Sequence, residues 1–253
     1  DLSQTRQMLM RFSIAGMVSY NIDEELATVN EKFYHVINAA ARTADYDIIE
    51  IYSSVGRGKQ NATFSLLDYR WDIVGVNSVG ISDSQGVAIV PYAAQLTLKK
   101  DLNFTFNGVL LGGRFALHGK HFDFNYKLFK FKCPDIDSLT MVVKGFKKDH
   151  LRDTLVKSVI EDLSGEFYVD NPNNKAGLKK FPEFPSFVST KKSYVYYNDP
   201  YVEKGVYKRD NFYFMLEPFK KDSLDEFQTK YLRFAGTFVS DSIFPDLKED
   251  LIV

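Results

Sequence analysis

Two histidines, an aspartate and a cysteine lie close together in GGRFALHGKHFDFNYKLFKFKC, residues 112–133. Side chains of these types bind transition metals when three or four of them converge. His118 and His121, however, are three positions apart in a stretch that alternates like a strand, so we expect their side chains on opposite faces unless a turn at Gly119 breaks the alternation. Asp123 and Cys133 are the nearest further ligands. The pattern favours polar strand residues, and we expect neither a metal nor a cofactor.

The motifs of common enzyme classes are absent from the sequence. It has no G-x-S-x-G, no P-loop, no G-x-G-x-x-G and no H-E-x-x-H. DNPNNKAG, residues 170–177, matches a calcium loop only in part, because Pro and Asn occupy ligand positions and the Gly comes late. A rigid turn fits that stretch better. Without a catalytic constellation, the sequence favours a protein that is not an enzyme.

Residues 181–214 form the densest aromatic stretch and offer a different chemistry. Exposed rings flanked by Asp and Asn suit a sugar, which is held by stacking and by paired hydrogen bonds. The candidate ligand-binding residues are Tyr194, Tyr196, Tyr197, Tyr201, Asp199 and Asp210. Alternating rings are equally what a β core needs. Both interpretations stay open, and the exposure of the rings separates them.

Composition limits the class of protein. The chain of 253 residues is 45% hydrophobic and 26% charged, which is ordinary for a globular protein with a core. Its 22 Phe and 15 Tyr favour β structure, because flat rings pack well on a pleated surface. The 32 Lys and Arg are balanced by 33 Asp and Glu, which argues against a nucleic-acid partner. No apolar run of ~18 residues is present, so we expect no transmembrane segment.

The single cysteine, Cys133, excludes an internal disulfide and a cysteine-based zinc cluster. We therefore expect it to be a free thiol. The chain opens without Met and closes on KEDLIV, which has the pattern of an unfinished strand. We expect the natural protein to continue and to cover that strand, because an exposed strand end pairs readily with other chains.

Residues 1–42 differ from the rest of the chain. Apolar residues recur at helical spacing before Gly16 and again in EKFYHVINAAARTA, and a polar turn at 23–25 predicts a hairpin between them. This order of helix, hairpin and helix is similar to the last part of a winged helix. The first helix offers few basic residues to a phosphate backbone, so protein docking or packing is the expected role.

Residues 43–253 show short strands separated by turns of Gly, Asn, Asp and Ser. Short strands without helices must bury one sheet face against another. The sequence therefore predicts a mainly β fold, an antiparallel meander that forms a sandwich or irregular stacked sheets. The small helix–hairpin–helix part at 1–42 is its cap. Residues 149–163 fit either a helix or two short strands, and we favour strands.

The clearest strand signal is FDFNYKLFKF. Phe122, Phe124 and Tyr126 share one strand face, and the polar residues between them share the other. A turn or bulge near Lys127 and Leu128 would return the following rings to the same apolar face. We expect a hairpin with its rings in the core.

Several stretches resemble segments of very long, uncharacterised proteins of Bacteroidota-type bacteria. They are NPNNKAGLKKFPEFPSFVSTKKSYVYY, GVYKRDNFYFMLEPFKKDSLDEF, FAGTFVSDSIFPDL, LLDYRWDIVGVNSVGISDSQGVAIVP and DLNFTFNGVLLGGRFALHGKHFDFNY. The likeness spans most of the chain from about residue 20 onward. It implies an internal piece of a large, β-rich, exported protein of the cell envelope, periplasmic or surface-exposed, and it carries no known catalytic residues.

These observations lead to one expected function and one alternative. The expected function is that of a non-enzymatic structural or interaction module, whose partners are the rest of a larger polypeptide or other envelope proteins. The alternative is a carbohydrate-binding or carbohydrate-acting module that uses the rings of residues 181–214.

Overall fold

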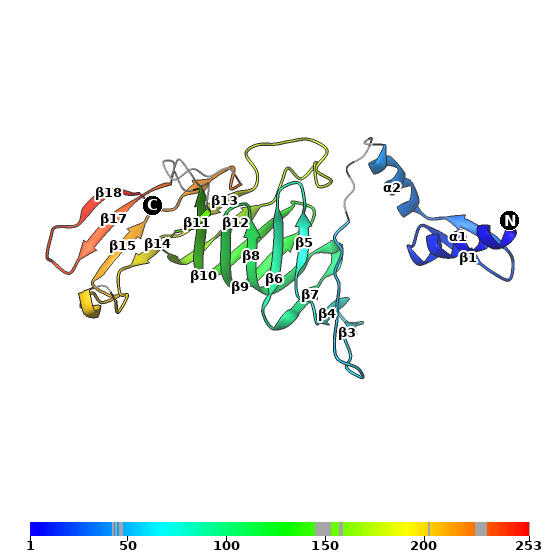
Figure 1. The fold of residues 1–253 in the computed structure, drawn as a ribbon, viewed down its shortest axis with the longest axis horizontal. Helices are drawn as coiled ribbons and strands as arrows, with labels where there is room; N and C mark the ends of the chain where they lie inside the picture. Colours follow the sequence, from blue (N-terminus) through cyan, green and yellow to red (C-terminus); the bar gives the residue numbers. More distant parts are fainter. Residues whose placement is uncertain are drawn as a thin grey trace. The chain divides into compact units, whose positions relative to one another are not determined.

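The computed structural model of the chain describes residues 1–253 except 42, 44, 46–47, 145–152, 157–158, 202, 226–231 and 253. The chain divides into two compact units (Figure 1). Unit 1 comprises Asp1–Ile48 and Asn173–Lys179, and unit 2 comprises Ile49–Pro172 and Lys180–Val253. The boundary expected from the sequence lay between residues 42 and 43, with 173–179 in the β-rich part. The observed division differs at both places.

Unit 1 contains two helices and a hairpin. Its elements are α1 (Leu2–Ile14), β1 (Val18–Asn21), β2 (Leu26–Val29) and α2 (Glu31–Ala40). The Asp1 carboxylate accepts a hydrogen bond from Ser3 N and caps α1, and Gly16 follows the helix at φ 71°. The rings of Phe12 and Phe33 meet edge to face at 6.4 Å. Neither helix contains a buried residue, and neither has the length and apolar composition that a membrane span requires among the described residues.

The stretch 170–177, for which the sequence predicted a rigid turn, contains turns at 172–173 and 175–176. Asn174 is buried, its Oδ1 accepts from Lys179 N at 2.8 Å, and its Nδ2 donates to Lys179 O at 2.8 Å. Asp170, the first residue of the partial calcium motif, belongs to unit 2, where its Oδ2 accepts from Gln85 Nε2 at 2.8 Å. The side-chain oxygens of Asp170 and Asn174 therefore accept hydrogen bonds from other residues of the chain.

Unit 2 is built from strands joined by short turns (Figure 1). The strands are β3 (Ala62–Ser65), β4 (Arg70–Val74), β5 (Val79–Ser82), β6 (Val87–Pro91), β7 (Gln95–Leu98), β8 (Phe104–Gly112), β9 (Phe115–Asn125), β10 (Lys130–Lys144), β11 (Asp153–Leu155), β12 (Ile160–Tyr168), β13 (Ser186–Ser189), β14 (Ser193–Tyr196), β15 (Phe212–Leu216), β16 (Lys220–Lys221), β17 (Arg233–Ser240) and β18 (Leu247–Ile252). The described residues also form short 3-10 turns, η1 (Tyr92–Ala94), η2 (Lys100–Leu102) and η3 (Glu203–Gly205). The fold is mainly β, with few helices.

The strands of unit 2 form one antiparallel sheet within the described residues. Its longest path runs β18-β17-β15-β14-β12-β10-β9-β8-β7-β4-β3. β5 and β6 branch from β8, β11 pairs with β10, and β13 and β16 branch from β12. Most neighbours in space are also neighbours in sequence, and the predicted mainly β, antiparallel fold is confirmed.

A row of large side chains crosses this sheet, and we call it the cross-strand row. Directly paired residues in successive strands are Phe64, Trp71, Leu98, Phe104, Phe124, Phe131, Phe167 and Phe187. Its five members from Phe104 to Phe187 are at most 2% exposed. The ring of Phe124 lies 4.7 Å from those of both Phe104 and Phe131, centroid to centroid. The row is therefore the middle of the core.

β9 and β10 form the hairpin that FDFNYKLFKF predicts. Phe122 and Phe124 are fully buried, and Tyr126 packs half-buried against the core. A turn follows, in which Asn125 Oδ1 accepts a hydrogen bond from Leu128 N at 2.8 Å. The predicted face of this strand and its turn are confirmed.

Within residues 149–163, β11 and the start of β12 from Ile160 onward are strand, so the preference for strands is confirmed at these positions. Residues 149–152 and 157–158 lie outside the described residues. Strand β18 pairs with β17 and is the last strand of the path, opposite to β3. The sequence predicted an unfinished strand that ends at Val253, and Val253 itself lies outside the described residues.

The packing of the cross-strand row predicts a large loss of stability when its centre is truncated. Phe124→Ala should lower the free energy of unfolding by ~3–5 kcal/mol, because it leaves a cavity among three rings. Asp123→Asn, one position away, should cost under ~1 kcal/mol, because that carboxylate is exposed and its contact with Lys99 is a surface ion pair. Denaturant melts of both variants measure this. Equal losses would show that the two faces of β9 are wrongly assigned.

Candidate functional site

The six candidate residues of stretch 181–214 lie in three different surroundings. Tyr194 and Tyr196 are on β14 and share one face of the sheet. Tyr197 follows the strand and packs edge to face against Phe212 and Phe238, with centroids 5.7 and 6.0 Å away. Burial there raises the pKa of Tyr197. The remaining three lie between β14 and β15: Asp199, Tyr201 and Asp210.

Tyr194 and Tyr196 belong to a tyrosine–arginine cluster, which also contains Tyr213 and Arg209. Tyr196 is paired with Tyr213 across β14 and β15. The rings of Tyr194 and Tyr196 are stacked, with centroids 5.6 Å apart and planes 19° apart. Tyr213 meets both rings edge to face, and Arg209 Cζ lies 3.6 Å from the Tyr196 ring centroid. The guanidinium is therefore in cation–π contact with the stack.

Two carboxylates of β12 fix the cluster. Arg209 Nη1 is 2.7 Å from Glu161 Oε2, and Arg209 Nη2 is 3.0 Å from Asp162 Oδ2. The Tyr196 hydroxyl donates to the same Asp162 oxygen at 2.9 Å. Burial, followed by the hydrogen bond to Asp162, raises the pKa of Tyr196 to about 12. The hydrogen bond to Glu161 raises the pKa of Arg209, so both groups stay protonated near neutral pH.

The cluster is therefore occupied by its own contacts. A sugar ring that stacks on tyrosine needs an open ring face, but the Tyr196 ring is in contact with two other rings and a guanidinium. The carboxylates beside this stack, Glu161 and Asp162, already bond Arg209 and Tyr196. The geometry suits a stabilising network on the sheet surface better than a binding platform.

The other predicted residues do not add to this cluster. Tyr201 is 97% exposed, and its backbone N donates to Asp199 Oδ1 at 2.9 Å, as in a local turn. Asp210 lines an open hollow of about 590 Å³ together with Asn211 and Phe244. These residues are thus not brought together into one site.

Sequence reasoning missed the residues that complete the cluster. Tyr213 had a usable signal, because it alternates with Phe212 and Phe214 as a strand residue does. Arg209 had none, because it lies in a turn outside any period and reaches Glu161 and Asp162 only through the fold.

The two histidines of β9 are not on opposite faces, which corrects the expectation. The register between β8 and β9 shifts after Phe106, so β9 has one extra residue there, and His121 has φ 56°. Because of this bulge, Lys120 and His121 are both exposed, side by side on the strand. His118 alternates with buried neighbours and is half-buried, so it lies on the same outer face as His121. A strict period of two does not survive a bulge.

His121 is instead paired with an acidic residue of β10. Its Nδ1 lies 2.7 Å from Asp135 Oδ2, and its backbone N donates to Asn107 Oδ1 at 2.8 Å. It borders a polar hollow of about 430 Å³ with Thr105 and Asp123. Both members of the His–Asp pair are well exposed, so water has access to this contact. Among the described residues, no three His, Cys, Asp or Glu side chains are grouped to hold a metal ion.

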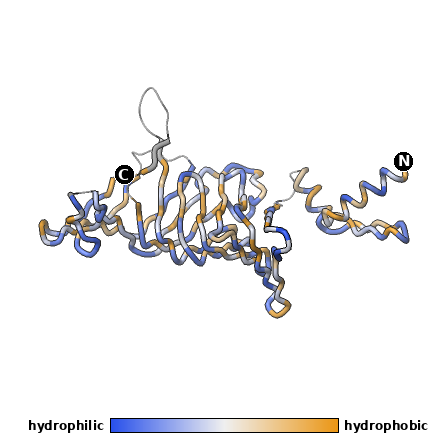
Figure 2. Tube along the Cα trace, turned by 60° about the horizontal axis from the view of Figure 1, so that its bottom comes forward, coloured by the Kyte–Doolittle hydropathy of each residue, from blue (hydrophilic) through white to orange (hydrophobic). Residues whose placement is uncertain are grey.

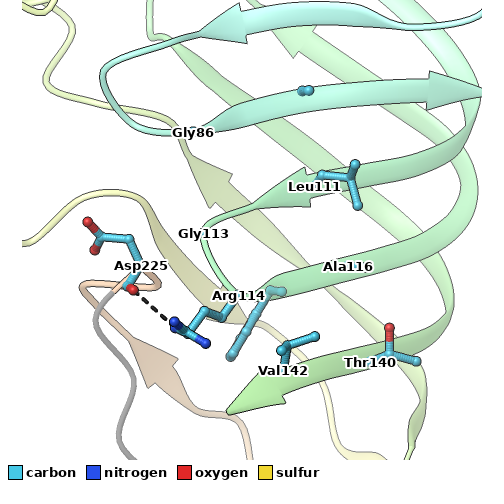
Figure 3. Close-up of a pocket in the computed structure, with 10 residues that line it drawn as sticks. Gly86, Leu111, Gly113, Arg114, Ala116, Thr140, Val142 and Asp225 are labelled. Atoms are coloured by element: carbon cyan, nitrogen blue, oxygen red, sulfur yellow. Dashed lines mark hydrogen bonds between the residues drawn. The ribbon is translucent and has the colours of Figure 1, made fainter. Parts of the chain in front are cut away.

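A further hollow, of about 540 Å³, lies on the outer side of β6, β8, β9 and β10 (Figure 3). Small side chains such as Ala116 and Thr140 form its floor, and Leu111 and Val142 stand beside them. Arg114 lies at its border, where Nε donates to the Asp225 carbonyl oxygen at 3.2 Å. The lining is mainly apolar and suits contact with another surface better than proton transfer.

The pKa of Tyr196 predicts how the cluster responds to alkali. A tyrosine whose pKa is raised on folding contributes stability that is complete below its ordinary pKa of 10.0 and is lost as the pH rises toward about 12. The difference in unfolding free energy between the wild type and Tyr196→Phe should therefore shrink between these pH values. Denaturant melts at several pH values measure it. A constant difference would show that the hydroxyl is not held by Asp162.

Cys133 is a buried thiol on β10, and burial raises its pKa. Reaction of the folded protein with a thiol reagent should be at least ~10³-fold slower than that of the unfolded protein, because access requires unfolding. The unfolded, unreduced chain should give one thiol. Rapid labelling without denaturant would contradict the burial, and a missing thiol would contradict the free state.

Comparisons of the chain with known proteins identify no family. No protein-family model, no curated protein and no solved structure matches it.

Proposed function

We propose that this chain is a non-enzymatic interaction module of a larger protein of the bacterial cell envelope. The proposal rests on the hairpin of residues 62–74, which lies at one end of the sheet of unit 2 and exposes large apolar side chains. We call it the apolar hairpin. It consists of β3, a four-residue turn and β4. Placement in an envelope protein rests on the resemblance of the sequence to long exported proteins.

Five large side chains of the apolar hairpin are exposed. They are Phe64 (41%), Leu66 (77%), Leu67 (96%), Tyr69 (53%) and Trp71 (47%). Figure 2 shows hydrophobic residues at the end of this hairpin. The rings hold one another in place, with the Phe64 centroid 5.1 Å from that of Trp71 and 6.3 Å from that of Tyr69. The group is therefore an ordered patch and not a set of isolated side chains.

Such a patch supports an interaction function for an energetic reason. Full burial of one large apolar side chain is worth ~1.5–3 kcal/mol, so several adjacent exposed ones favour association. Contiguous apolar patches on protein surfaces mark contacts with proteins or membranes. Lys100 Nζ lies 4.5 Å from the Tyr69 ring centroid, and Arg70 is paired with Asp72, so charged groups border the patch. An apolar centre with a polar border is the usual anatomy of an interface.

Two further features of the fold are part of this proposal. We infer that unit 2 packs in the manner of a sandwich or stacked sheets. The supporting observation is that the buried residues of strands from β5 to β17 form one continuous hydrophobic cluster. We also infer a winged-helix-like arrangement within unit 1, which the order α1, β1, β2, α2 supports. The carbohydrate alternative has weaker support, because the rings of residues 181–214 contact one another and Arg209.

Trp71 allows a direct test, because it is the single tryptophan of the chain and lies in the apolar hairpin. Purified protein mixed with envelope fractions of a Bacteroidota bacterium should show Trp71 emission shifted to shorter wavelength and protected from acrylamide. The double variant Leu66→Ser, Leu67→Ser should bind at least about tenfold more weakly, because these side chains are the most exposed of the patch.

Leu128→Ser is the matched control, because Leu128 is also exposed, at the turn between β9 and β10. It should bind as the wild type does. Equal binding and equal protection of Trp71 in the double variant would overturn the role of the hairpin.

A further inference from the structure

Strand β3 ends the sheet, and within the described residues it pairs only with β4. Val74 N donates to Asn61 O at 3.0 Å. In an antiparallel pair, the backbone groups of alternate residues point toward the partner strand, so the N–H and C=O groups of Asn61 and every second residue after it face β4. The backbone groups of Ala62 and Phe64 therefore point toward the open edge. The Gln60 side-chain amide donates to Ala62 O at 3.0 Å, which leaves Ala62 N–H and both groups of Phe64 directed outward.

This edge lacks the usual protection against pairing. Edge strands are commonly guarded by charged residues or proline, and the β3 sequence ATFS contains neither. The cross-strand row also ends here. Its members are buried in the middle of the sheet, but Phe64 and Trp71 are exposed because the described chain places no further strand beside β3. At this end of the cross-strand row, residues of the kind that are buried elsewhere in the row are left exposed.

We propose that the β3 edge pairs with the same edge of a second copy of this chain, antiparallel, with the two Phe64 residues at the centre. The inference rests on the proposed function, since it names the partner of the same apolar hairpin. A contact between identical edges is symmetric and closes after two copies. It satisfies the outward backbone groups by strand addition and continues the cross-strand row from one copy into the other.

Charge favours a second copy as the occupant. In an antiparallel pair, the tip of one hairpin lies beside the residues that precede β3 in the other. The tip carries Asp68 and the preceding stretch carries Arg57 and Lys59, all three exposed. With the two Phe64 residues opposite each other, Leu66 lies opposite Ala62 of the second copy. The exposed leucine is then covered, and Asp68, whose Oδ2 is 3.6 Å from Arg70 Nη1 in its own hairpin, also gains the basic stretch of the second copy, twice by symmetry.

A lipid bilayer fits the hairpin less well. An open strand edge would carry its unpaired N–H and C=O groups into hydrocarbon, where each costs several kcal/mol. Asp68 adjoins the two leucines, and the hydrogen bond from the Ser65 side chain lowers its pKa, which keeps the carboxylate charged at the tip. Strand pairing leaves that charge in water beside a basic stretch.

Sedimentation equilibrium of the purified chain over a concentration series tests the proposal. The wild type should form a dimer and no larger species. Ala62→Pro removes an outward N–H but no bond to β4, so it should keep the melting temperature and raise the dimer dissociation constant at least about tenfold. Leu128→Ser, remote from the edge, should dimerise as the wild type does.

A charge exchange tests the orientation independently of proline. Asp68→Lys places like charges beside Lys59 of the second copy and should weaken the dimer several-fold, as should Lys59→Asp. The double variant should restore the wild-type dissociation constant. Rescue requires that the two positions meet between copies.

Three results would overturn the inference: a monomer at all concentrations, a dimer unaffected by Ala62→Pro, or a double charge variant no better than the single ones. Flotation with lipid vesicles that depends on Leu66 and Leu67, without dimerisation, would assign the hairpin to a membrane instead. If dimerisation fails while the wild type still binds envelope fractions through the hairpin, the interaction function stands and only the second copy is excluded.

Discussion

The contact between directly paired rings in neighbouring strands holds unit 2 together. Phe104, Phe124 and Phe131 come from three successive long strands, and each ring packs against the next. Because paired residues must face the same side of the sheet, this row fixes the register of every strand it crosses. Glycine completes the packing where a ring needs room. A Cβ on Gly112 would lie 2.1 Å from Phe167 Cζ, so no larger residue fits there.

The same constraint explains why the functional surface is sparse. A core made of rings uses more than half of the phenylalanines of the chain, including Phe187 and Phe214 from the stretch that suggested sugar binding. On the other face, the tyrosines of β14 are held by Arg209 and the carboxylates of β12. The exposed apolar group that continues the core lies at the end of the sheet, where β3 is the last described strand.

Local alternation was sufficient to predict the strands and the β9–β10 hairpin, because the spacing of Phe122, Phe124 and Tyr126 is itself the geometry of a pleated strand. It was not sufficient at His121. One inserted residue in β9 moves the His121 side chain to the same face of the sheet as His118, and alternation alone does not predict where such an insertion occurs. The site could be predicted only in part. Tyr194 and Tyr196 are two apart and must lie together, whereas Arg209 joins them through a turn whose path depends on the whole fold. The exposure of Leu67 likewise depends on which strands lie beside β3, and a local pattern does not contain that information.

The meander has a consequence for how the protein forms and changes. Most strands on the longest path pair with strands close to them in sequence, so most backbone pairings close short loops. Local pairings of this kind lower the entropy lost in each step and allow folding to spread hairpin by hairpin from the ring-rich centre. They also mean that a hairpin gained or lost at an edge leaves all other pairings intact. A sheet of this kind can change length over evolution while its centre stays the same.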